Sequence, residues 1–322
     1  MAEAKGKVAI VGSGLIGRSW AMLFTSGGYK VSIFDIKREQ IESALADIER
    51  QMKDLERSGK LRGSLSAEEQ LKLISVSNDL TECVKGAIHI QECVPEILDL
   101  KKKVYIQLDD IVDEQTVLSS SSSAMPCSSY TENLKNRTNA IVSHPVNPPY
   151  YMPLVELIPS PWTSADVVSR TKRLMTDINQ VPVLLKKEVV GFVQPRIQYV
   201  IIQECLNLWK EGVMSAEDID LMMTEGLAYF YSFMGPLEKL HLSSEGGISE
   251  TLDLYSKLYG EDPGTNPVKM NNNPELQELF EAMNRRIPLD SLNERRAWRD
   301  KNIAKLSSER RTLEEDGKQE SS

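Results

Sequence analysis

The stretch Lys7-Val-Ala-Ile-Val-Gly-Ser-Gly-Leu-Ile-Gly17 decides the fold class, because a short apolar run leads directly into three closely spaced glycines. The helical pattern Leu15–Ser26 follows at once. A strand, this glycine spacing and a helix together are typical of a dinucleotide-binding Rossmann unit. Gly12 permits the tight turn, Gly14 lets the backbone approach a pyrophosphate, and Gly17 lets the helix pack closely on the strand. Free N–H groups at the helix start favour the diphosphate.

An acidic residue stands where the adenosine ribose is expected. A second apolar run, Lys30–Phe34, ends at Asp35, 18 residues after Gly17. A carboxylate there binds ribose hydroxyls and repels a 2′-phosphate, so we expect NAD rather than NADP. Lys37 and Arg38 follow closely, and we interpret them as solvated residues at a helix start. The alternative, a glycine turn that binds no nucleotide, does not account for the acid in register.

Beyond this unit, strand-like and helical patterns alternate up to about residue 190, which predicts a parallel doubly wound sheet. Further strands are expected at Ala87–Cys93, Thr116–Ser119, Asn139–Ser143, Pro153–Ile158 and Val181–Leu185, and helices at Lys37–Arg57 and after the capping box Ser66–Glu69. Helical patterns then take over, as at Ser215–Asp218 and Pro274–Arg286. We predict a Rossmann-type α/β domain at 1–188, an all-helical substrate and dimerisation domain at 189–305, and a polar, disordered tail at 306–322.

Composition excludes several classes of function. The 322 residues carry a net charge of −9, which argues against a nucleic-acid partner. No apolar run approaches the roughly 20 residues that span a bilayer, and residues 1–7 lack the features of a signal peptide. The four cysteines are scattered, so neither a metal site nor a disulfide framework is expected. We expect a cytoplasmic protein with no membrane association.

A histidine and a glutamate are candidates for acid–base chemistry. His144 follows the expected strand Asn139–Ser143, at the strand end where open α/β sheets bind ligands. Glu156 lies among apolar residues of the next strand, and a buried carboxylate needs a partner. The prolines of 148–153 turn the chain back, which predicts that Glu156 holds the His144 imidazole while it acts as a general base. His89 and His241 are interpreted as structural.

Five consecutive serines, Ser119–Ser123, follow another expected strand. They are either a flexible polar loop or the source of a hydroxyl that binds a substrate oxygen. Composition alone does not distinguish these two interpretations.

Long stretches of the chain resemble the 3-hydroxyacyl-CoA dehydrogenase superfamily. They include residues 11–24, His89–Glu96, His144–Tyr151 and Pro153–Glu156, and the resemblance runs over roughly residues 6–300. It implies an NAD-dependent dehydrogenase that acts as a homodimer on a small hydroxy acid. The site residues that it implies are Leu15, Ile16, Asp35, Glu96 and Lys101 for NAD, His144 and Glu156 for catalysis, Ser123 for catalysis and substrate binding, and Asn147 lining the site.

One position departs from the family pattern. The family carries an asparagine in a Gly-Phe-Val-x-Asn-Arg motif, and this chain has Pro195 in Gly191-Phe-Val-Gln-Pro-Arg196. Proline is tolerated in a first helical turn, so the fold survives, but one polar contact to the reacting oxygen is lost. Gln194 precedes Pro195 and carries an amide. One residue along a helix turns a side chain by about 100°, so we do not expect this amide to replace the lost contact.

Three functions follow from these observations. The first is oxidation of a 3-hydroxy acid, with L-gulonate as the expected substrate and 3-dehydro-L-gulonate as the product. The second keeps the chemistry but acts on a 3-hydroxyacyl-CoA. The third, suggested by Pro195, is a weakly active or inactive NAD-binding protein with a structural role.

Overall fold

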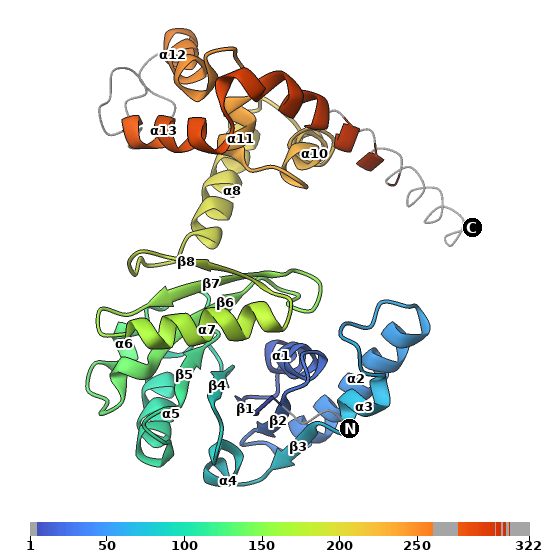
Figure 1. Cartoon of the computed structure of the whole chain (residues 1–322), viewed down its shortest axis with the longest axis vertical. Coiled ribbons are helices and arrows are strands. Elements are labelled where there is room, and N and C mark those ends of the chain that lie inside the picture. Colours follow the sequence, from blue (N-terminus) through green and yellow to red (C-terminus); the bar gives the residue numbers. More distant parts are fainter. Residues whose placement is uncertain (1–4, 260–275, 300, 304, 307–308, 310–322) are drawn as a thin grey trace. The chain divides into compact units, whose positions relative to one another are not determined.

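The computed structural model describes residues 5–259, 276–299, 301–303, 305–306 and 309 (Figure 1). Contacts divide the chain between Ile202 and Gln203 into two compact units. The first unit holds a β-sheet with helices on both of its faces, and the second is helical in its described part. The predicted fold class, a Rossmann-type sheet followed by helices, is confirmed.

One eight-stranded sheet forms the centre of the first unit, in the order β3-β2-β1-β4-β5-β6-β7-β8. All neighbouring strands run parallel except the antiparallel pair of β6 and β7. The strands are β1 Lys7–Val11, β2 Lys30–Phe34, β3 Ile74–Ser77, β4 His89–Glu92, β5 Val117–Ser120, β6 Ala140–Pro145, β7 Leu154–Pro159 and β8 Val181–Leu184.

Helices cover both faces of this sheet, as the alternating sequence pattern predicts. They are α1 Leu15–Ser26, α2 Arg38–Arg57, α3 Ala67–Leu71, α4 Leu80–Val84, α5 Leu98–Ile111, α6 Ser128–Thr131 and α7 Ala165–Asp177. One apolar core joins α1, α2 and α7 to the sheet, with Trp20, Met52 and Leu174 among its members. A second core on the other face contains Cys83 of α4 and Tyr105 of α5.

Every predicted strand is observed, with ends that agree or differ by one or two residues. β3 was not predicted, because Ile74-Ser-Val-Ser77 is short and none of its residues is fully buried. It pairs with β2 on one side only and forms an edge of the sheet. The predicted capping box is present, since the Ser66 hydroxyl accepts from the Glu69 amide and the Glu69 carboxylate accepts from the Ser66 amide.

The helix α8, Gln194–Lys210, leads from the first unit into the second. The helices that follow are α9 Ala216–Leu221, a π-helical turn at Met222–Leu227, α10 Ala228–Tyr231, α11 Pro236–His241, α12 Gly247–Tyr259 and α13 Gln277–Arg286. Ser215 caps α9 as predicted, while the π-helical turn was not predicted. Of the helix expected at Pro274–Arg286, residues 274–275 lie outside the described part, as does most of the expected tail at 306–322.

A buried polar cluster holds the second unit together. The Glu238 carboxylate is fully buried and pairs with Arg286 at 2.8 Å and Arg295 at 2.6 Å. The His241 ring is bonded at both nitrogens, since Nε2 lies 2.8 Å from the Ile287 carbonyl and Nδ1 accepts from the Ile248 amide. His241 therefore has the structural role that the sequence suggested.

Candidate active site

The glycine loop between β1 and α1 has the shape of a pyrophosphate cradle. Gly12 has a φ of +106°, and a Cβ there would lie 2.7 Å from the Cys93 carbonyl oxygen. A Cβ on Gly17 would lie 2.0 Å from the Gly12 oxygen. Gly14 differs, because among the described atoms a Cβ there would meet nothing within 4 Å. The fold itself therefore requires glycine at 12 and 17, whereas glycine at 14 leaves open space for a ligand.

Asp35 is fixed beside this loop at the end of β2. Its Oδ2 accepts from the amide and the hydroxyl of Ser13, both at 2.8 Å. Its Oδ1 accepts from the Lys37 amide at 3.0 Å. Leu15, at the start of α1, is exposed. The acid thus stands next to the open side of the loop, where a ribose is expected.

His144 and Glu156 face each other across the antiparallel pair of β6 and β7. The prolines between the strands turn the chain back, and the register places the two residues directly opposite. His144 Nδ1 lies 2.8 Å from Glu156 Oε2, and both side chains are buried. A carboxylate has only acceptors, so Nδ1 carries the hydrogen and Nε2 keeps its lone pair in the neutral ring. The predicted juxtaposition is therefore observed.

The second oxygen of Glu156 binds the start of α8. Its Oε1 accepts from the amides of Val193 at 3.0 Å and Gln194 at 2.9 Å. Burial alone would raise the pKa of Glu156, but the hydrogen bonds from His144 and these two amides outweigh it and hold the pKa below its usual value. Glu156 is therefore an anion that ties the imidazole to the N-terminus of a helix, where a negative charge is stabilised.

Pro195 is the second residue of α8 and is partly buried. Its nitrogen has no hydrogen to donate, and the Glu156 carboxylate is already served by the two preceding amides. Proline therefore fits the first turn without loss of a helix bond. It leaves α8 without a side-chain donor at the position where the family motif has asparagine.

The serine run is divided between buried and exposed hydroxyls. Ser119 bonds Ser143, and Ser120 bonds Glu92. Ser121 accepts from Trp20 and Gln91, and Ser122 bonds Glu96. Ser123 is exposed and makes no hydrogen bond among the described residues. It is therefore the member of the run whose hydroxyl is available, at the carboxyl end of β5.

A buried ion pair lies beneath this loop. Lys101 Nζ lies 2.9 and 3.0 Å from the two carboxylate oxygens of Glu92, and 3.4 Å from Glu96 Oε2. Lys101 and Glu92 are almost fully buried. Lys101 and Glu96 are predicted NAD contacts, whereas Glu92 was not among the residues predicted for this site. The signal was present, since Glu92 ends a strand on the same edge of the sheet as His144.

Asn147 is the remaining residue that was predicted to line the substrate site. Asn147 is exposed in the turn that follows β6. Among the described residues, no group of three or more His, Cys, Asp or Glu side chains has the geometry of a metal site. Within the same part of the chain, no helix is long and apolar enough to cross a membrane.

Two family models match the chain. The model of the 3-hydroxyacyl-CoA dehydrogenase NAD binding domain covers residues 7–189, and that of the C-terminal domain covers residues 191–283. The chain belongs to the 3-hydroxyacyl-CoA dehydrogenase family. The resemblance seen in the sequence is confirmed, and the first domain is an NAD-binding domain. The glycine loop and Asp35 are the groups of this chain that fit the cofactor.

Known relatives cover nearly the whole chain. Lambda-crystallin of Oryctolagus cuniculus is 49% identical over 318 residues, which cover 97% of this chain and 98% of the relative. L-Carnitine dehydrogenase of Streptomyces coelicolor is 31% identical over 279 residues, 86% and 85% of the two chains. Among solved structures, an NAD+-dependent 5-dehydrogenase of a pyridine carboxylic acid matches with a TM-score of 0.72 at 25% identity, over 96% of this chain and 98% of that one.

Proposed function

We propose that the protein oxidises a 3-hydroxy acid to the 3-oxo acid with NAD, and that its substrate is L-gulonate. The observation that carries this proposal is the buried His144–Glu156 pair, whose geometry leaves Nε2 as a proton acceptor. Residues 1–188 would bind NAD, and residues 189–305 would contribute substrate and dimer contacts. The L-carnitine dehydrogenase relative supports a free acid as substrate, because L-carnitine is itself a 3-hydroxy acid.

In this mechanism the side chains of the protein remove one proton from the substrate. His144 Nε2 takes the proton of the substrate hydroxyl while the carbinol carbon becomes a carbonyl. Glu156 keeps Nδ1–H in place and stabilises the imidazolium that forms. Bound NAD supplies the hydride acceptor. The helix start at Val193 and Gln194 holds Glu156 still, so the base does not have to reorganise during the reaction.

Two further groups would orient the substrate. The free hydroxyl of Ser123 would donate to the substrate oxygen, and this assignment rests on its being the unengaged member of the serine run. Asn147, exposed just beyond His144, would line the site. Glu96 would also contact NAD. Burial would raise its pKa, but the hydrogen bond from Ser122 and the charge of Lys101 outweigh burial and lower the pKa. Leu15, Ile16 and Lys101 complete the proposed cofactor contacts.

Pro195 favours a second candidate function, a protein that binds NAD but turns over slowly. A donor aimed at the reacting oxygen is worth about 10²–10³ in rate. Here that donor is replaced by a proline. The relatives called lambda-crystallin are named for a structural role, which agrees with this alternative.

We also propose a cytoplasmic homodimer. Apolar side chains on α8, among them Ile202, Leu206 and Trp209, are exposed in the single chain. Such a stripe is typical of an interface. The four cysteines are free, which suits a reducing compartment. Light scattering should give twice the chain mass at micromolar concentration, and a stable monomer would contradict the dimer.

The test of the function is NADH formation with L-gulonate, L-carnitine, 3-hydroxybutyrate and 3-hydroxybutyryl-CoA, each with NAD and with NADP. We expect the highest kcat/KM for L-gulonate and NAD, because Asp35 repels a 2′-phosphate. A preference for the thioester would instead establish the acyl-CoA activity. NAD binding without reduction by any substrate would establish the structural role.

A further inference from the structure

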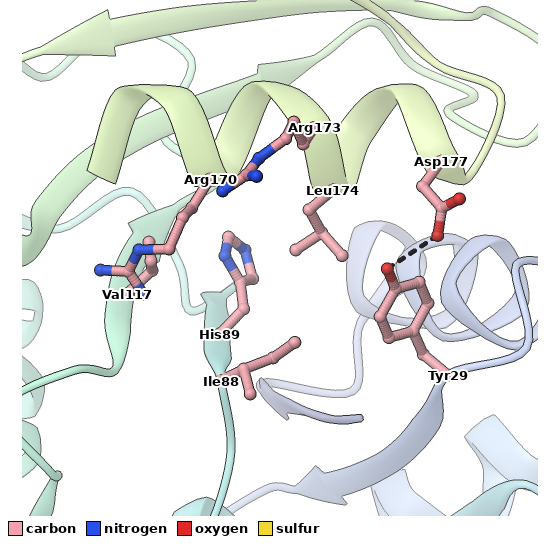
Figure 2. A pocket seen from close by; sticks show the side chains of 8 residues that line it. All are labelled: Tyr29, Ile88, His89, Val117, Arg170, Arg173, Leu174 and Asp177. Atoms are coloured by element: carbon pink, nitrogen blue, oxygen red, sulfur yellow. Dashed lines mark hydrogen bonds between the residues drawn. The ribbon is translucent and has the colours of Figure 1, made fainter. Parts of the chain in front are cut away.

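A cavity of about 310 Å³ opens beside the amino ends of the central strands, whereas His144 lies near the carboxyl end of its strand (Figure 2). It lies at the amino ends of the strands, where His89 begins β4 and Val117 begins β5. The helix α7 forms its other wall with Arg170 and Arg173, and in Figure 2 the Arg173 guanidinium lies on the side of His89 whereas the Arg170 side chain extends toward Val117. Neither the glycine loop nor the His144–Glu156 pair contributes to it.

Among the described residues, the charges around this cavity leave one guanidinium without a partner. Arg170 is partly engaged, since its Nε donates to Asp166 at 2.7 Å and its Nη1 to the Gln115 carbonyl at 2.6 Å. Asp177 is bound by Lys5 at 2.8 Å and by the Tyr29 hydroxyl at 2.7 Å. Arg173 makes no hydrogen bond or ion pair within the described part of the chain. The cavity therefore presents donors and an excess of positive charge.

His89 adds a buried nitrogen that has no hydrogen-bond partner in the described part of the chain. The side chain is 1% exposed, and its Nε2 lies 3.0 Å from Gln91 Oε1. The Gln91 amide is fixed in this orientation because its Nε2 donates to Ser121 at 2.7 Å and faces the Ser143 carbonyl. His89 Nε2 therefore carries the hydrogen, and Nδ1 is left as a bare acceptor with no partner among the described residues.

The Arg173 guanidinium favours an anion, and the acceptor nitrogen of His89 favours a proton donor. A ligand that is both would therefore fit this cavity. We infer that this cavity binds a phosphate-type oxyanion, inorganic phosphate or a small phosphate monoester, together with one proton shared with His89 Nδ1. The guanidinium groups of Arg173 and Arg170 would take the unprotonated oxygens, which suit their fork of N–H donors. A phosphate monoester carries an exchangeable proton near neutral pH, because its second pKa is about 6. Carboxylates and sulfate carry none there.

Burial of His89 favours this coupling between oxyanion binding and proton uptake. It lowers the pKa of His89 to about 4, against the opposing hydrogen bond of Gln91 and with help from the charge of Arg170. The free protein therefore holds His89 neutral at physiological pH, and a proton enters only with the oxyanion. The other titratable or charged residues that line the cavity are Arg173, Asp177 and Tyr29, and the last two are hydrogen-bonded to each other.

The test is calorimetric titration of the full chain with inorganic phosphate, glycerol phosphate and sulfate at pH 6.5 and 8. NAD is kept at saturation so that the glycine loop is occupied. We expect both phosphates to bind with proton uptake, measured in buffers of different ionisation enthalpy, and sulfate to bind at least tenfold more weakly at pH 8. Tighter binding of the monoester than of phosphate would identify an organic ligand, and the reverse would identify the free ion.

Matched variants on α7 distinguish a specific phosphate site from general electrostatic attraction to a basic surface. Arg173→Gln should weaken phosphate binding at least tenfold, whereas Lys172→Gln, which removes the same charge one residue away, should change it less than twofold. His89→Gln keeps a partner for Gln91 and removes Nδ1, so it should abolish the proton uptake. Equal effects of the Arg173 and Lys172 variants, or equal binding of sulfate and phosphate at pH 8, would overturn the inference.

Discussion

His144 and His89 are buried in the same sheet near opposite ends of its strands, yet their rings face different partners. His144 binds a carboxylate through Nδ1, and His89 binds an amide oxygen through Nε2. The carboxylate of Glu156 is itself anchored by two helix amides, whereas Gln91 is neutral. The two rings therefore carry their hydrogens on opposite nitrogens.

The difference shows that burial alone does not make a histidine inert or reactive. An anion beside His144 stabilises the imidazolium, which is what a general base needs after proton uptake. For His89, burial lowers the pKa and the charge of Arg170 adds to this effect, so the neutral ring is favoured. The hydrogen-bond partner, Glu156 on the neighbouring strand for His144 and Gln91 on the same strand for His89, decides which chemistry each histidine can perform.

The largest effect should come from removing the His144 ring. His144→Ala should lower kcat for L-gulonate by about 10³-fold or more, because proton transfer by a positioned base contributes about 10²–10⁴. NAD affinity should change little, since the glycine loop and Asp35 lie elsewhere. Steady-state kinetics and a fluorescence titration with NAD measure the two quantities. His89→Gln is the matched control, and turnover within tenfold of wild type in His144→Ala would remove His144 from the mechanism.

Glu156→Gln should have the next largest effect. The amide keeps the shape but loses the negative charge, so kcat should fall about 10²-fold. The shape of the pH–rate profile should also change, because the negative charge beside the proposed base is lost. A profile that is merely scaled down, with both limbs unmoved, would show that Glu156 acts only as a packing residue.

His89 should govern stability in mild acid. Its pKa is lowered from 6.5 to about 4 in the folded chain, so between these values the unfolded chain binds a proton that the folded chain does not. Stability is therefore lost as the pH falls from about 6.5 toward 4. Between pH 7 and 5 the wild type should lose about 2 kcal/mol more of its free energy of unfolding than His89→Gln. Urea denaturation in phosphate-free buffer measures this, and parallel curves for the two proteins would refute it.

Pro195→Asn should give the smallest change. It restores a donor in the first turn of α8, where asparagine is well accepted. We expect kcat for L-gulonate to rise several-fold with little change in melting temperature. Gln194→Ala is the comparison variant, because it removes the neighbouring amide. Robust wild-type turnover that Pro195→Asn leaves unchanged would show that this site needs no donor there.

The sequence was sufficient for features that depend on local patterns. The run Lys7–Val11 and the glycine spacing specify a strand, a turn and a helix within a few residues. The facing of His144 and Glu156 was also predictable, since prolines turn the chain and a buried carboxylate demands a partner.

Features that depend on distant partners were not predictable. Glu92 and Lys101 form their ion pair only because α5 lies against β4, and each alone resembles an ordinary charged residue. The unpartnered nitrogen of His89 follows from the orientation of Gln91, which Ser121 sets from another strand end. The edge strand β3 has too few apolar residues to be distinguished from a loop.

The most direct test of the central claim is the tautomeric state of each histidine ring, read from 15N chemical shifts of the imidazole nitrogens at pH 7.5. The chain has three histidines, so single variants assign every signal. The structure predicts the hydrogen on Nδ1 in His144 and on Nε2 in His89. A hydrogen on Nε2 of His144 would leave the proposed base without its lone pair and would contradict the account.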